Sequence, residues 1–169
     1  MPVLPIRFFP DPILRKPSKA VRLRDPRLER FLKDLLETLR AQPHGIGIAG
    51  PQVGEGIRVI IVDVSLRDPS KRLEVMVNPI LRYREGETLS REGCMSLPDY
   101  TANVVRAERV SVEWTDLSGR KCRKWASGIE AVCLQHEIDH LNGLLFIDRV
   151  TSLKTDVFPR QGKAGRRAP

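Results

Sequence analysis

The chain has 169 residues, of which 41% are hydrophobic and 30% are charged, a balance that predicts one globular domain with a core and excludes extensive disorder. No stretch approaches the roughly 18 apolar residues that a membrane span needs, and prolines and charges near the N-terminus interrupt any apolar segment of a signal peptide. The net charge of +8 is carried by the two ends of the chain, since residues 1–40 hold ten Lys/Arg against five Asp/Glu and residues 160–169 hold four basic residues. We therefore expect no sequence-specific nucleic-acid binding.

The first predicted element is an amphipathic helix near the N-terminus. Residues 1–24 are rich in proline and arginine and are expected to form an extended arm. Asp25 is a good N-cap, and Pro26 suits the first helical position. The apolar residues that follow recur every three or four positions and form one stripe: Leu28, Phe31, Leu32, Leu35 and Leu39. Pro43 and Gly45 end the helix.

Short strands and a second helix follow a glycine-rich loop at 45–52. Runs typical of strands occupy 57–64, 74–77, 80–83, 104–114 and 121–125. The second helix begins at Ser127, which is expected to form a capping box with Glu130, and Asn142-Gly143 ends it. The pattern predicts an α+β fold in which short, mainly antiparallel strands pack around the second helix.

The second helix contains the sequence QHEIDH, in which two histidines flank a glutamate. His136 and His140 are one turn apart on the same face, near enough to share one metal ion. At 100° per residue both imidazoles point inward with the apolar stripe, and Glu137 lies at its edge. Two buried imidazoles with unsatisfied nitrogens are costly. We therefore favour a metal site over two core histidines that bond to the backbone.

A third ligand is needed, and the sequence offers few. The acidic residues after Glu137 are all aspartates, so the downstream His or Glu of HExxH peptidases is absent. The three cysteines are expected to be thiols in a reducing cytoplasm. Cys94, in EGCMS, is the strongest candidate beside this helix, although alone it would be interpreted as an inert thiol. For Cys122 and Cys133 we favour packing. Two imidazoles and one thiolate leave a fourth position for water, the open arrangement of a catalytic site.

Three segments together resemble the motifs of the peptide deformylases, in the same order. The glycine loop is similar to GxGxAAxQ, with Gly50 in place of the second alanine, 92–96 is similar to EGCxS, and 135–143 is similar to QHExDHLxG. The likeness implies a single deformylase-like catalytic domain, which we place at 1–158. The remaining residues, 159–169, are expected to be a basic tail without structure of its own.

The resemblance implies a metal-dependent hydrolase that removes the N-formyl group from the initiator methionine of new polypeptides and releases formate. It implies that Cys94, His136 and His140 bind the metal and that Glu137 is the general acid/base. It also implies that Gln52 and the backbone N–H of Met95 stabilise the oxyanion. Family members often use Fe(II), and zinc, nickel or cobalt can substitute. The implied partners are N-formylmethionyl nascent peptides, and contact with the ribosome through the basic ends is a further expectation.

Substrate binding is expected around the same centre. An apolar pocket for the methionine side chain is expected to be lined by Ile46, Ile48, Val132 and Cys133. Gly47 is expected to let the peptide backbone approach closely. Loop packing explains the two isoleucines equally well. Glu92 and Asp139 are interpreted as carboxylates that orient the metal ligands, with a solvated carboxylate as the alternative for Asp139.

Two other functions use the same residues. A general metallopeptidase would use the same helix, and the missing downstream ligand argues against it. A binding protein with a structural metal, attached to RNA through its basic ends, would need a fourth protein ligand, for which His44, Cys133 or a carboxylate are the candidates.

Overall fold

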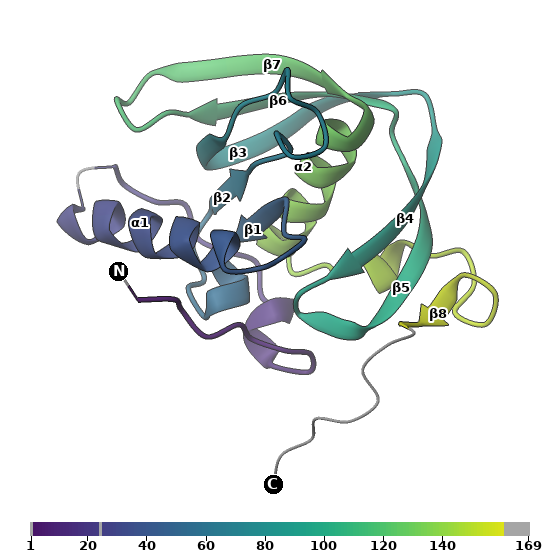
Figure 1. The fold of residues 1–169 in the computed structure, drawn as a ribbon. Coiled ribbons are helices and arrows are strands. Elements are labelled where there is room, and N and C mark those ends of the chain that lie inside the picture. Colours follow the sequence, from purple (N-terminus) through teal and green to yellow (C-terminus); the bar gives the residue numbers. More distant parts are fainter. Residues whose placement is uncertain (1, 24, 161–169) are drawn as a thin grey trace, which may run out of the picture.

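The computed structural model describes residues 2–23 and 25–160, and its elements form two antiparallel sheets and two α-helices (Figure 1). The five-stranded sheet has the order β1-β2-β3-β6-β7, and the three-stranded sheet has the order β4-β5-β8. The strands of the first sheet are β1 (Gly47–Ala49), β2 (Val59–Val62), β3 (Glu74–Glu85), β6 (Arg109–Thr115) and β7 (Lys121–Ser127). Those of the second are β4 (Thr88–Cys94), β5 (Leu97–Arg106) and β8 (Val157–Pro159). The α+β prediction is confirmed.

Both predicted helices are present. Helix α1 (Pro26–Arg40) begins after Asp25, whose side chain accepts a hydrogen bond from the backbone N–H of Arg27. Helix α2 (Gly128–Leu141) begins after Ser127. The predicted capping box is wrong, because Ser127 makes no side-chain cap bond and Glu130 pairs with Lys124 and Lys71 instead. Three short 3-10 helices complete the set: η1 (Pro12–Arg15), η2 (Gly50–Val53) and η3 (Phe146–Arg149).

The strands differ from the prediction in number and in bounds. The runs 74–77 and 80–83 form one strand, β3, which continues through an irregularity where Asn78 has a φ of 53°. The run 104–114 is divided between β5 and β6. Strand β4 was not predicted, because its sequence, TLSREGC, is mostly polar. Strand β8, which includes Pro159, was also not predicted, and residues 161–169, most of the expected tail, lie outside the described residues.

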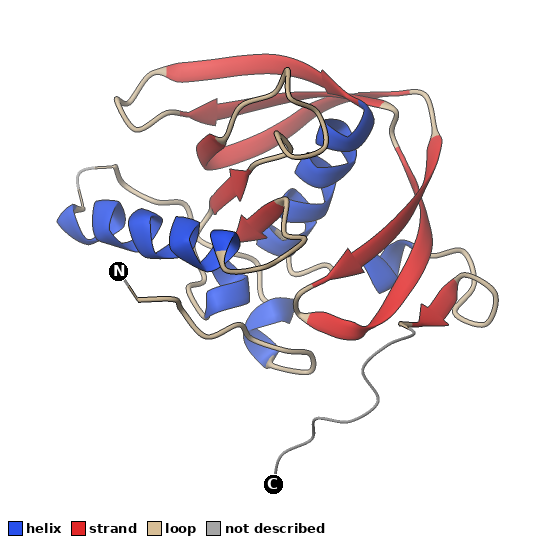
Figure 2. Cartoon of the chain, viewed as in Figure 1, coloured by secondary structure: helices blue, strands red, loops and turns tan. Residues whose placement is uncertain are grey.

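Successive side chains of a strand point to opposite faces of the sheet, so the five-stranded sheet has an apolar core on each face. In β2, Ile60 and Val62 pack towards α2, whereas Val59 and Ile61 pack towards the leucines of α1. Helix α2 therefore lies inside the molecule with the sheets around it, and α1 covers the outer face of the larger sheet (Figure 2). A third apolar cluster beneath the smaller sheet includes Cys94 and Phe146. No helix in the described part of the chain combines the length and apolar character needed to cross a membrane.

Candidate metal centre

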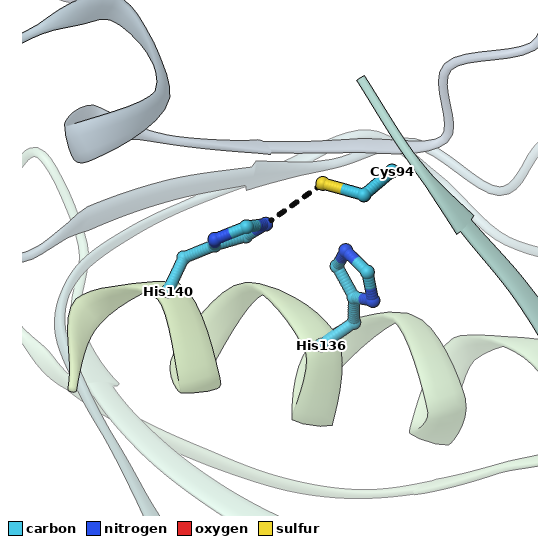
Figure 3. A group of neighbouring side chains, drawn as sticks. All are labelled: Cys94, His136 and His140. Carbon is cyan, nitrogen blue, oxygen red and sulfur yellow. Dashed lines mark hydrogen bonds between the residues drawn. The ribbon is translucent and has the colours of Figure 1, made fainter. Parts of the chain in front are cut away.

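Strand β4 and helix α2 bring one cysteine and two histidines together (Figure 3). The ligand atoms of Cys94, His136 and His140 all lie within 4.8 Å of one another, and Cys94 Sγ is 3.3 Å from His140 Nε2. Cys94 follows a register shift between β4 and β5, an irregularity that redirects a side chain at the end of a strand. Cys94 and His140 are buried, and the His136 side chain is only 11% exposed.

The donor chemistry of this group fits a divalent transition-metal ion. Burial alone would raise the pKa of the Cys94 thiol, but His140 and His136 outweigh it and hold that pKa well below its usual value. The Nδ1 atom of His136 lies 2.8 Å from Glu92 Oε2, which leaves its Nε2 for the centre. A thiolate with two neutral imidazoles is a donor set that zinc, iron, nickel and cobalt accept. The described residues place no fourth Cys, His or acidic ligand in this group, which argues against a structural metal site.

A buried ion network lies behind His136. The Arg106 guanidinium donates from Nε and Nη2 to both carboxylate oxygens of Glu92, at 2.7 and 2.9 Å, and from Nη1 to Asp139 at 2.6 Å. Asp139 also pairs with Arg149 at 2.7 Å. Burial would raise the pKa of Glu92, but Arg106 and His136 lower it to about 2, so the carboxylate stays ionised and orients the imidazole. Asp139 is buried and reaches His136 only through Arg106 and Glu92, so the solvated alternative is wrong.

Glu137 faces the glycine loop from α2. Its carboxylate is buried, and Oε2 has no hydrogen-bond partner among the described residues. Burial raises the pKa of Glu137 to about 7, so the group can both take and return a proton near neutral pH. A Cβ atom at Gly47 would lie 2.6 Å from Glu137 Oε1 and 2.7 Å from Cys133 Sγ, so only glycine leaves room for this carboxylate.

Gln52, on η2, directs its amide towards the centre. Its Oε1 accepts a hydrogen bond from the Ala49 backbone at 2.9 Å, and its Nε2 lies 3.5 Å from Cys94 Sγ and 3.4 Å from Ser96 Oγ. The substitution of glycine for alanine in the first motif has a local cause. A Cβ atom at Gly50 would lie 2.8 Å from two backbone carbonyl oxygens, so the close approach of the chain requires glycine there.

A cavity of about 390 Å³ opens beside the centre, between β1 and β4. The expected substrate residues Ile46, Gly47, Val132 and Cys133 line it, as do the oxyanion candidates Gln52 and Met95. Ile48 does not line the cavity, because it packs in the core against α1, so loop packing explains this isoleucine. Cys122 lies apart on β7, near Asp116.

Three arginines that were not predicted from the sequence also line this cavity. Arg67, Arg91 and Arg160 come from three separate segments of the chain. Residues so far apart in sequence carry no common spacing that could have identified them, and β8, which positions Arg160, was not predicted.

Comparison with known proteins gives one consistent match. Residues 3–156 match the family model described as polypeptide deformylase. The peptide deformylase of Mesorhizobium japonicum is 43% identical over 164 residues, covering 96% of this chain and 93% of that protein, and the peptide deformylase of Thermodesulfovibrio yellowstonii is 40% identical over 163 residues, covering 96% and 98%. The crystal structure of a peptide deformylase from Synechococcus elongatus in complex with actinonin has a TM-score of 0.83 at 37% identity and covers 91% of this chain and 82% of that one. The Thermotoga maritima peptide deformylase has a TM-score of 0.82 at 32% identity, covering 90% and 100%.

Proposed function

The chain belongs to the peptide deformylase family, and from this premise we propose which of its residues hold the metal, move the proton and bind the peptide. The protein is a metal-dependent hydrolase that removes the N-formyl group from the initiator methionine of new polypeptides and releases formate. The observation that carries the assignment of roles is the convergence of three ligand atoms within 4.8 Å, beside a buried carboxylate at the base of a cavity.

The proposed metal ligands are Cys94, His136 and His140. When bound, a divalent ion supplies a Lewis acid and lowers the pKa of a water molecule towards neutrality. We propose Fe(II) as the metal in the cell because the family resemblance implies it, and the same donor set accepts zinc, nickel or cobalt as substitutes. Glu92 keeps the Nδ1 proton of His136 in place, so that Nε2 remains free to bind the ion.

Glu137 is proposed as the general acid/base. A nearby cation favours its ionised form, so the carboxylate accepts a proton from the attacking water. Oxygen of the formyl group becomes negative as the carbon turns tetrahedral, and preorganised donors stabilise that charge. We assign this role to Gln52 Nε2 and the backbone N–H of Met95. Glu137 then returns its proton to the amine of methionine as the carbon–nitrogen bond breaks.

The shape of the cavity supports a peptide substrate. Ile46, Val132 and Cys133 offer apolar surface for an unbranched methionine side chain. Strands β1 and β4 lie at the edges of their sheets, each with one side that pairs with no other described strand. Both contribute to the cavity wall, so an extended peptide can pair with them as an added strand.

The setting of the reaction is also a proposal. A substrate made of new polypeptides places the enzyme in the cytoplasm, with residues 1–158 as one catalytic domain. Basic residues near both ends provide a charge that favours contact with the anionic ribosome. Such contact should weaken steeply as the salt concentration rises.

Metal titration tests the ligand assignment. Co(II) added without oxygen to the metal-free protein should bind at one equivalent per chain and produce a thiolate-to-metal absorption band. Cys94→Ser should lose the band, whereas Cys133→Ser should keep it, and the control is matched because the two cysteines are 5% and 4% exposed. A band that survives Cys94→Ser would contradict the assignment.

A further inference from the structure

Three arginines give the mouth of the cavity a positive charge. Arg67 lies in the loop after β2, Arg91 lies on β4, and Arg160 directly follows β8. All three are exposed, and within 2–23 and 25–160 none forms an ion pair. The carboxylates that line the cavity, Glu92 and Glu137, are buried at its base. The mouth therefore attracts anionic groups, and no carboxylate of the described chain occupies it.

Arg91 is largely engaged by its neighbours. Its guanidinium donates to Thr101 Oγ1 at 3.0 Å and to Asn103 Oδ1 at 3.2 Å, and its Cζ lies 3.7 Å from the centre of the Phe158 ring. These contacts fasten β4 to β5 and β8. Arg91 thereby supports the segment that carries Arg160.

Arg160 is fixed through its backbone and free at its tip. Strand β8 pairs with β5, Thr101 opposite Phe158, and the Arg160 N–H donates to the Asp99 carbonyl at 2.8 Å. The side chain forms no hydrogen bond to any other described residue. The five donors of its guanidinium are thus available to a ligand at the cavity mouth.

The guanidinium lies over Gly93, the residue before the proposed metal ligand Cys94. A Cβ atom at Gly93 would lie 2.7 Å from Arg160 Nη2, so the missing side chain leaves the space that the guanidinium fills. An extended peptide advances about 3.3 Å per residue. A substrate with its formyl group at the centre and its backbone along β4 runs from Cys94 past Gly93, and its residues after the methionine therefore pass beside the Arg160 guanidinium.

We propose that Arg160 is a specificity-determining residue that binds a carboxylate on the second residue after the formylmethionine of the substrate. The inference rests on the proposed function, because it uses the same cavity and the same direction of the peptide. Guanidinium and carboxylate match in charge and in geometry, with two parallel N–H···O bonds. The interaction is distant from the reacting atoms, so it is equally strong before and in the transition state and acts on KM and not on kcat.

Two isosteric peptides test the proposal: formyl-Met-Ala-Asp-amide and formyl-Met-Ala-Asn-amide. The metal-loaded wild-type enzyme should prefer the Asp peptide by about 2- to 5-fold in kcat/KM at low ionic strength, the effect of an exposed ion pair. The preference should come from KM and disappear at high salt. Arg160→Gln should treat the two peptides alike, because its KM for the Asp peptide rises to that for the Asn peptide. Arg120→Gln, in the exposed turn before β7, should keep the preference.

The result that would overturn the proposal is formate release without preference in the wild type, or a preference that survives Arg160→Gln. Formate release from neither peptide by metal-loaded protein would instead contradict the proposed function. Calorimetric binding of the products, Met-Ala-Asp-amide and Met-Ala-Asn-amide, tests Arg160 in that case as well. Tighter binding of the Asp product that is lost in Arg160→Gln supports the assignment, and equal binding of the two products overturns it.

Discussion

Arg106 offers a sharp test of how the metal centre is supported. The Arg106 and Glu92 side chains are only 4% and 5% exposed, and Arg106→Met replaces the guanidinium by an apolar group of similar length. Asp139 keeps Arg149 as a partner, but Glu92 keeps only His136. Removal of one partner from a buried ion pair costs about 3–5 kcal/mol, because the other charge is left without compensation. A typical domain has a free energy of unfolding of about 5–15 kcal/mol, so Arg106→Met should lose a large fraction of its stability.

The free energy of unfolding is measured by denaturant titration at a fixed excess of Ni(II), with tryptophan fluorescence as the signal. Arg109→Met is the matched control, since Arg109 pairs with Glu85 while their side chains are 54% and 53% exposed. The control should lose less than about 1 kcal/mol. Equal losses in the two variants, or a loss below about 1 kcal/mol in Arg106→Met, would refute the argument that burial makes this network critical.

Three further predictions concern the centre itself. Gly47→Ala should lower kcat by about 100-fold, because the new methyl group displaces the Glu137 carboxylate. The control Gly56→Ala should be neutral, because its Cβ would meet Ile13 at an ordinary 3.5 Å, and comparable rates in the two variants would contradict the role of Gly47. Gln52→Ala should lower kcat by about 100- to 1000-fold with little change in KM, if its amide stabilises the oxyanion, and an unchanged kcat would remove it from that role. Burial would lower the pKa of His136, but its hydrogen bonds to Cys94 and Glu92 raise that pKa well above its usual value. The Ni(II) affinity should therefore fall as the pH is lowered from 8 to 6, by about tenfold per pH unit for each proton displaced, and an affinity that does not change with pH would contradict the ligand set.

The sequence contained most of the information for the helices. The N-cap and apolar stripe of α1 depend on neighbours in sequence, and both were predicted. The capping box of α2 failed because Glu130 pairs with Lys71, a residue about sixty positions away, and with Lys124 of β7. Local rules cannot predict such competition between distant partners.

The residues proposed for the centre could be selected from the sequence because their chemistry is concentrated in short motifs. His136 and His140 share one face of a helix with Glu137 at its edge, and the inventory of cysteines left Cys94 as the strongest candidate for a third ligand. The buried partner of Glu92, Arg106, was not predicted, since nothing in its local sequence distinguishes it from an exposed arginine. Arg160 reaches the cavity only through the pairing of β8 with β5, a contact between segments far apart in the chain.

The most direct measurement is formate release from a formylmethionyl peptide by Glu137→Gln and wild-type protein loaded with equal amounts of metal. If Glu137 moves the proton, the variant should keep one metal ion per chain and lose about 100- to 10,000-fold in kcat. A variant with equal metal content and undiminished turnover would contradict the central assignment.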